Sequence, residues 1–336
     1  SLKGAGVGVA VIDSGIAAAP EFDTRIIAFY DFTQGGIATS PYDDYGHGTH
    51  VAGLIGANGS TSNGQFAGVA PAVRLIGLKA LDEKGGGYTS TVIAAIEFAI
   101  ANKQALGIDI INLSLGHPIF ESATTDPLVR AVENAVAAGI VVVCSAGNFG
   151  MNPDTGVVGY AGITSPGNAR SAITFGASNT QNTVTRSDDT VADFSSRGPT
   201  WYDGYAKPDL VAPGDRMVSV GARLSWLTTG YPELRVTMRN YRFLRLSGTS
   251  MAAAVGSGVA ALVIQSHRYY QPGAPLTPNA AKAILQFTAI SMNKPDGTKY
   301  DALTQGTGEV NAAGAITLAA ALDLSLIHIS EPTRPY

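Results

Sequence analysis

The sequence of 336 residues has little cysteine, little charge and no long uninterrupted apolar run. Its one cysteine, Cys144, excludes an internal disulfide, so a hydrophobic core must stabilise the fold. Only 14% of the residues are charged, with 22 Lys and Arg against 26 Asp and Glu and no basic cluster, so nucleic acid is not an expected partner. The apolar stretch 252–264 is short and interrupted by glycine, so we expect no membrane-spanning helix.

Apolar residues and glycine are abundant. The hydrophobic fraction is 45%, far from the composition of disordered chains, and 40 glycines occur singly or in small groups that indicate tight turns. Short β-branched runs alternate with longer helix-like segments, a pattern typical of a parallel sheet with crossover helices. We therefore expect an α/β fold with three layers, in which helices cover both faces of a mostly parallel central sheet.

The expected elements follow this alternation. The predicted strands are 8–12, 74–80, 108–113, 140–145 and 173–176, and the predicted helices are 46–54, 89–103, 127–138, 249–265 and 277–286. Residues 1–322 are predicted to form one domain. Residues 223–246 break the rhythm and are expected to be an inserted hairpin or loop. The last residues, 323–336, look like translated cloning sequence and are interpreted as a non-native tail.

Three segments each place a reactive side chain at the end of a strand or the start of a helix, where α/β proteins build active sites. Asp13 ends the run VAVID, His47 lies in GHGTHVAG, and Ser250 lies in SGTSMAA. A serine hydroxyl becomes a good nucleophile when an imidazole takes its proton, and a carboxylate then orients the imidazole. The residues predict an acyl-transfer triad with Ser250 as nucleophile, His47 as base and Asp13 as the orienting group.

The segments DSG, HGTHVAG and GTSMA, in this order, resemble those of the subtilisin-like serine protease family, the subtilases. The order Asp, His, Ser differs from that of the α/β-hydrolases, and Ser250 lacks the second glycine of their G-x-S-x-G motif. The resemblance extends over roughly residues 6–321. It implies that SAGN, residues 145–148, supplies Asn148 as an oxyanion donor opposite the Ser250 main-chain N–H.

The same resemblance implies a peptide-binding site. Its predicted residues are Gly85, Gly86, Gly87, Ser114, Leu115, Gly116, Ala146 and Gly147. In the family, the first two segments pair with an extended peptide, and strand addition of this kind reads the backbone and tolerates many sequences. Small residues in the matched segments favour an apolar residue before the scissile bond, and either Gly159 or Thr164 could form the base of that pocket.

The family implies a secreted, monomeric endopeptidase that acts on proteins or peptides and is made with a signal peptide and a folding propeptide, both absent here. No cofactor is expected for catalysis, whereas structural calcium is possible. Oxygen ligands could come from Asp43, Asp44, Asp154, Asp188, Asp189 and Asp193. Because residues 58–66 do not clearly reproduce the family's common calcium loop, the metal ligands stay unknown.

Other histidines and the cysteine carry weaker signals. His50 is expected to have a structural role because no HExxH motif accompanies it. His117, His267 and His328 carry no motif and are expected at the surface or in structural roles. Cys144 lies in an apolar run and is predicted to be a buried, unreactive thiol.

Three other functions stay open. Ala254 stands where the family usually has proline, four residues after the serine, and this change relaxes a predicted first helical turn. It raises the hypothesis of a peptide ligase or transpeptidase, while residues 223–246 suggest a specific processing enzyme. A non-catalytic binding scaffold is the third possibility, but an intact triad argues against it.

Overall fold

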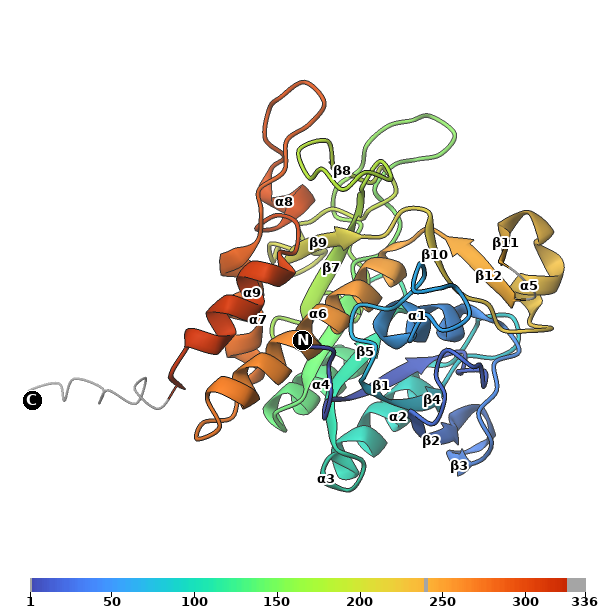
Figure 1. Cartoon of the computed structure of the whole chain (residues 1–336). Helices are drawn as coiled ribbons and strands as arrows, with labels where there is room; N and C mark the ends of the chain where they lie inside the picture. Colours follow the sequence, from blue (N-terminus) through green and yellow to red (C-terminus); the bar gives the residue numbers. More distant parts are fainter. Residues whose placement is uncertain (1, 239–240, 325–336) are drawn as a thin grey trace, which may run out of the picture.

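The computed structural model describes residues 2–238 and 241–324 and has an α/β architecture (Figure 1). The strands of its main sheet lie in the order β3-β2-β4-β1-β5-β6-β7-β8, with β9 paired to β7. They are β1 (Gly8–Asp13), β2 (Ile26–Asp31), β3 (Ile37–Ala38), β4 (Arg74–Lys79), β5 (Ile108–Leu113), β6 (Val141–Ser145), β7 (Ile173–Asn179), β8 (Thr190–Val191) and β9 (Leu210–Pro213). Only the short strands β3 and β8 pair antiparallel with their neighbours.

Alternate residues of the central strand β1 point into two separate hydrophobic cores. Val9 and Val11 pack into the core formed with helices α1 (His47–Gly56), α6 (Thr249–Tyr270), α7 (Pro278–Thr288) and α9 (Ala312–Ala321). Ala10 and Ile12 pack into the core formed with α2 (Thr89–Ala101) and α4 (Pro127–Ala137). Since side chains alternate between the faces of a strand, both faces of the sheet are covered. The predicted three-layer fold is confirmed.

Helix α6 crosses the larger core and is longer than predicted. The helix has 22 residues, and an 18-residue window of it has a mean hydropathy of 1.4. By length and composition alone, such a helix could cross a membrane. The expectation that this run is too short for a span was therefore wrong. However, 89% of that apolar window is buried inside the protein, as is typical of a core helix. Gly256 permits this packing, because a methyl group there would lie 2.3 Å from the Phe175 ring.

The predicted boundaries are close to those observed, with a few differences. The expected helix 89–103 ends at Ala101, and a short helix α3 (Lys103–Leu106) follows. Strands β2 and β9 were not predicted. Residues 325–336 of the predicted tail lie outside the described residues.

Residues 223–246 form a helix and a hairpin. The helix α5 (Trp226–Gly230) is followed by a 3-10 turn (Pro232–Leu234) and by β11 (Arg235–Met238) and β12 (Tyr241–Leu246). These two strands and β10 (Met217–Val220) form an antiparallel sheet in the order β10-β12-β11. The sheet and α5 lie on the side of the molecule that carries α1, and α7 and α9 lie on the other side (Figure 1).

Candidate active site

The fold brings Asp13 and His47 into direct contact. Asp13 is the buried last residue of β1, and His47 is the first residue of α1. The Nδ1 atom of His47 lies 2.8 Å from Oδ1 of Asp13, which also accepts the main-chain N–H of Ser14 at 2.7 Å. Because the carboxylate is an acceptor, Nδ1 carries the hydrogen. The Nε2 atom of a neutral His47 is then free to take a proton.

The surroundings of His47 make it a stronger base. Burial lowers its pKa, but the charge of Asp13, the hydrogen bond to Asp13 and the charge of Asp43 outweigh this effect and raise the pKa above 6.5. The side chain is still 18% exposed, so one side of the ring is accessible from solvent. The imidazole therefore bonds a buried carboxylate through one nitrogen and is partly open to solvent.

Ser250, the second residue of α6, lies against Ser114. Its hydroxyl donates to the Ser114 carbonyl at 3.0 Å, and its own carbonyl accepts the Ser114 hydroxyl at 2.9 Å. Ser114 lines the same cleft as His47. A hydrogen bond from Ser250 to Nε2 of His47 therefore requires the hydroxyl to rotate away from Ser114. Such bonds are commonly long or absent before a substrate is present.

Asn148 lies beside the start of α6. Its Oδ1 accepts the main-chain N–H of Thr249 at 2.9 Å and the Thr249 hydroxyl at 3.1 Å. The Thr249 hydroxyl also accepts the N–H of Gly147 at 3.0 Å. In the described part of the chain, neither Nδ2 of Asn148 nor the main-chain N–H of Ser250 has a partner. Two hydrogen-bond donors are thus available at the positive end of a helix, where negative charge is stabilised.

A cleft of about 580 Å³ runs along His47 between the two predicted peptide-binding segments. Gly85, Gly86 and Gly87 form one side, and Ser114, Leu115 and Gly116 form the other. Across the described residues, the main-chain groups of Gly87 and Gly116 make no hydrogen bond, so both can pair with a strand. The Gly86 N–H instead donates to Asp82.

Ala146 and Gly147 lie outside the lining of this cleft. The N–H of Ala146 donates to Phe175, and the N–H of Gly147 donates to Thr249, so neither donor is available to a peptide strand. Thr164 packs against Gly116 of the cleft lining and against Gly147 outside it. A methyl group at Gly116 would lie 2.8 Å from Thr164 Oγ1, and one at Gly147 would lie 2.8 Å from Thr164 Cγ2. Thr164 therefore fills the space next to Gly116 and Gly147.

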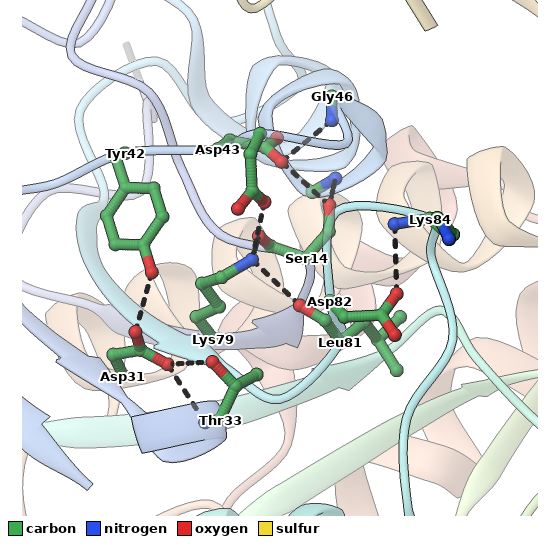
Figure 2. Close-up of polar contacts among 12 residues, drawn as sticks. Ser14, Asp31, Thr33, Tyr42, Asp43, Gly46, Lys79, Leu81, Asp82 and Lys84 are labelled. Atoms are coloured by element: carbon green, nitrogen blue, oxygen red, sulfur yellow. Dashed lines mark hydrogen bonds and ion pairs between the residues drawn. The ribbon is translucent and has the colours of Figure 1, made fainter. Parts of the chain in front are cut away.

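A polar network around Lys79, Ser14 and Asp43 was not predicted (Figure 2). The buried ammonium of Lys79 donates to the carbonyls of Ser14 and Leu81, both at 2.8 Å, and to Asp44 at 2.6 Å. The Ser14 hydroxyl donates to Asp43 at 2.9 Å. The network connects the turn after β1 with the loop before His47 and with the cleft residue Leu81. It was missed because no local motif marks these contacts.

Asp43 holds the loop before His47 in place. Its carboxylate accepts the N–H of Gly46 at 2.7 Å, and the N–H and hydroxyl of Thr49 at 2.8 and 2.6 Å. Burial raises the pKa of Asp43, although these hydrogen bonds act in the opposite direction. Every carboxylate oxygen therefore has a partner, which leaves Asp43 a structural part of the site.

Three of the other histidines lie in the described residues. His50 is buried, and its Nε2 faces the carbonyls of Met217 and Leu244 at 3.0 and 3.1 Å. Burial lowers its pKa to about 3, so it is neutral. His267 is also buried and bonds two carbonyls. His117 lines the cleft and stacks on Phe120, a position that its sequence did not indicate. His328 lies outside the described residues.

Cys144 and the acidic side chains give no sign of a second reactive centre. Cys144 is buried in β6, and burial raises its pKa to about 12, so the reactive thiolate is inaccessible. Within residues 2–238 and 241–324, no three His, Cys, Asp or Glu side chains gather as a metal site. The Asn58 side chain in the 58–66 loop bonds Asp23 and Ser60. No calcium ligands can be assigned from these contacts.

Ala254 is fully buried in α6. Because the helix begins at Thr249, position 254 belongs to its second turn, and not to the first turn that the sequence suggested. A proline here would lack the N–H that an α-helix directs to the carbonyl four residues earlier, which is that of Ser250. The residue at position 254 therefore determines whether the Ser250 carbonyl can accept a helical hydrogen bond.

Comparisons with known proteins identify the family. A model of the Subtilase family matches residues 4–315. Serine protease AprX of Bacillus subtilis (strain 168) is 40% identical over 321 residues, which cover 94% of this chain and 67% of that protein. Subtilisin DY of Bacillus licheniformis is 33% identical over 313 residues, which cover 93% of this chain and 92% of that protein.

Solved structures show the same relationship. The structure described as "S41 Psychrophilic Protease" aligns with a TM-score of 0.72 at 30% identity and covers 92% of each chain. A cold-adapted subtilisin-like serine proteinase aligns with a TM-score of 0.64, also at 30% identity, and covers 89% of this chain and 88% of its own. Family, fold and sequence agree along nearly the whole chain, which is therefore a member of the subtilase family of serine proteases.

Proposed function

We propose that the protein is a serine endopeptidase in which Ser250, His47 and Asp13 form the catalytic triad and Asn148 binds the oxyanion. The observation that carries this proposal is the 2.8 Å contact between His47 Nδ1 and the buried carboxylate of Asp13. His47 lines the same cleft as Ser114, whose carbonyl accepts the Ser250 hydroxyl. The contact with Asp13 leaves Nε2 as the acceptor for the serine proton.

The reaction proceeds through an acyl-enzyme. Ser250 Oγ attacks the scissile carbonyl carbon while His47 Nε2 takes the proton of the Ser250 hydroxyl. The oxygen that becomes negative accepts hydrogen bonds from Asn148 Nδ2 and the Ser250 N–H, the two donors without a partner in the described residues. Collapse of this intermediate breaks the C–N bond, and the leaving amine takes the proton from His47. A water molecule then attacks the acyl carbon while His47 takes one of its protons. His47 returns this proton to Ser250 Oγ as the ester bond breaks, which releases the acid and restores the enzyme.

The substrate is a peptide in extended conformation. Gly87 and Gly116 offer main-chain groups on the two sides of the cleft, and recognition of the backbone supports broad specificity. An apolar residue before the scissile bond is favoured because the described cleft residues include no carboxylate but do include the apolar side chains of Leu81, Leu115 and Leu128. The same observation disfavours a processing enzyme that cuts after basic residues.

The remaining properties rest on family membership. We infer a secreted monomer, one peptidase domain over residues 1–322, maturation with a folding propeptide, and no catalytic cofactor. Structural calcium stays a prediction without named ligands. None of these properties is needed for the chemistry at Ser250.

The decisive experiment is hydrolysis of a mixed-sequence fluorogenic peptide library by the wild type, by Ser250→Ala and by enzyme labelled with a fluorophosphonate. We expect broad cleavage that is lost in both controls. An unchanged rate in a pure, folded Ser250→Ala variant would refute the assignment of the nucleophile. A folded wild type that neither cleaves nor reacts with the fluorophosphonate would point to a scaffold.

Ala254 favours one alternative, a ligase, and the same assay distinguishes it. Adding a peptide amine measures how the acyl-enzyme partitions between the amine and water, in the wild type and in Ala254→Pro. Mainly hydrolytic products support the endopeptidase. Mainly ligated products in the wild type, shifted toward hydrolysis by proline, would support the ligase.

A further inference from the structure

Tyr45 connects the loop before His47 to one side of the cleft. It lies two residues before His47, and its ring lines the cleft beside Gly85. A methyl group added at Gly85 would lie 2.5 Å from the ring atoms Cε1 and Cζ and 3.0 Å from Cδ1. These nearly equal distances place Gly85 over the face of the ring. The position of the peptide-binding segment is therefore coupled to the position of Tyr45.

Trp226 of α5 supports the Tyr45 ring. The two rings stack with their centroids 5.7 Å apart and their planes at 22°. Tyr231 packs on Trp226 from the far end of α5, with centroids 5.0 Å apart and planes at 65°. Trp226 is 43% exposed, and its ring contacts both aromatic neighbours. The three rings form a continuous row from the 223–246 segment to the cleft wall.

The main chain of α5 is fixed to the same loop. The N–H of Trp226 donates to the Asp44 carbonyl at 2.7 Å, and the N–H of Leu227 donates to the Tyr45 carbonyl at 3.0 Å. Gly46 has φ +105°, and a methyl group there would meet the Ser225 hydroxyl oxygen at 2.4 Å. The start of α5 is thus packed against the residue before His47. These contacts do not depend on the Trp226 side chain, so replacing that side chain tests the aromatic row separately.

We propose that α5 is a positioning element of the peptide cleft: Trp226 holds Tyr45 against Gly85 and so fixes the edge that pairs with the acyl side of an extended substrate. The proposal rests on the proposed endopeptidase function and extends it to the 223–246 segment. Trp226 is not among the cleft-lining residues. It acts through Tyr45 and is a positioning residue, not a catalytic one.

This role predicts a dependence on substrate length. A peptide of six residues reaches along the edge formed by Gly85 and Gly87, whereas an ester of a single acylated amino acid occupies only the space next to Ser250. We expect Trp226→Ala to raise KM for the hexapeptide about 2- to 12-fold, the range that corresponds to the loss of an aromatic pair. The kcat should change by less than about twofold, and the short ester should be cleaved normally.

The experiment compares Trp226→Ala with Trp226→Phe and with Trp201→Ala. Phenylalanine retains a ring that can stack on Tyr45, so it should restore most of the affinity. Trp201 is an exposed tryptophan outside the cleft lining and is the matched control, which should behave as the wild type. Titration of active sites with a fluorophosphonate and a thermal melt show that equal amounts of folded, active enzyme are compared.

The outcomes separate this proposal from the proposed function. If the wild type cleaves the hexapeptide and Trp226→Ala has an unchanged KM, the positioning role is refuted while the endopeptidase stands. An equal loss with the hexapeptide and the ester would also refute it, since that pattern indicates a general defect of the site. If Trp226→Ala does not fold, Tyr231→Ala removes the outer end of the row and should raise the same KM by a smaller factor.

Discussion

Thr249 gives the sharpest test of how Asn148 is held. Its hydroxyl donates to Asn148 Oδ1 at 3.1 Å and accepts the Gly147 N–H at 3.0 Å, and its own N–H donates to the same Oδ1 at 2.9 Å. Thr249→Val keeps the shape of the buried side chain and removes the hydroxyl. One of the two hydrogen bonds that orient the Asn148 amide is then lost, and the Gly147 N–H loses its acceptor.

The size of the effect follows from these two losses. A single neutral hydrogen bond contributes about 0.5–1.5 kcal/mol, so a misoriented amide should lower kcat by about 2- to 12-fold. The unsatisfied Gly147 N–H should lower the free energy of unfolding by about 1–3 kcal/mol. Removal of the oxyanion amide from subtilisin itself costs about 10²–10³-fold in kcat, a magnitude known for that enzyme and not worked from this structure.

A double-mutant cycle separates orientation from general damage. We expect Thr249→Val to lower kcat in the wild-type background but to have little further effect when Asn148 is already alanine. Thr249→Ser keeps the hydroxyl and loses one buried methyl group, so its kcat should be close to that of the wild type. The reasoning is refuted if valine lowers kcat equally in both backgrounds, or if serine is as damaging as valine.

Two further predictions concern pH. Because Asp13 and Asp43 raise the pKa of His47 and only the neutral ring accepts a proton, kcat/KM should rise with pH through a pKa above 6.5, and a midpoint below 6.5 would contradict the assignment. Burial and the neighbouring Glu309 raise the pKa of Asp189 to about 7. The protonated acid therefore stabilises the folded state at low pH, and this stabilisation is lost as the pH rises from about 4 to 7. In the inactive Ser250→Ala background, Asp189→Asn should therefore increase the melting temperature more at pH 8 than at pH 5. The exposed Asp154→Asn should show no such difference, and a gain at pH 5 as large as that at pH 8 would count against the buried acid.

The proposed catalytic residues stand out in the sequence because each belongs to a local motif at an element boundary. Asp13 ends a fully buried strand, and His47 and Ser250 lie in the first turns of α1 and α6. The carboxyl ends of parallel strands meet at one edge of a sheet, so a correct reading of the strands brings these motifs together. The same reasoning predicted the alternation of elements and the two covered faces of the sheet.

The surroundings of these residues could not be predicted, because they depend on contacts between distant segments. Lys79 reaches the Ser14 carbonyl from 65 positions away, and the hydroxyl of Ser250 bonds a carbonyl 136 positions away. Trp226 and Tyr45 are each unremarkable in sequence, and only the fold stacks one on the other. Hydrophobic periodicity determines which face of an element is buried, but it does not determine which distant side chain completes a polar network.

Ala254 combines both kinds of information. The sequence reveals the departure from the usual proline, and the structure shows that its consequence differs from a relaxed first turn. The Ser250 carbonyl already accepts the Ser114 hydroxyl at 2.9 Å. With alanine, the N–H of residue 254 is available to the same carbonyl, whereas proline would leave Ser114 as its donor. Because the Ser250 hydroxyl also bonds Ser114, we expect the residue at 254 to affect how firmly this hydroxyl is held. Partition of the acyl-enzyme is therefore the property to measure.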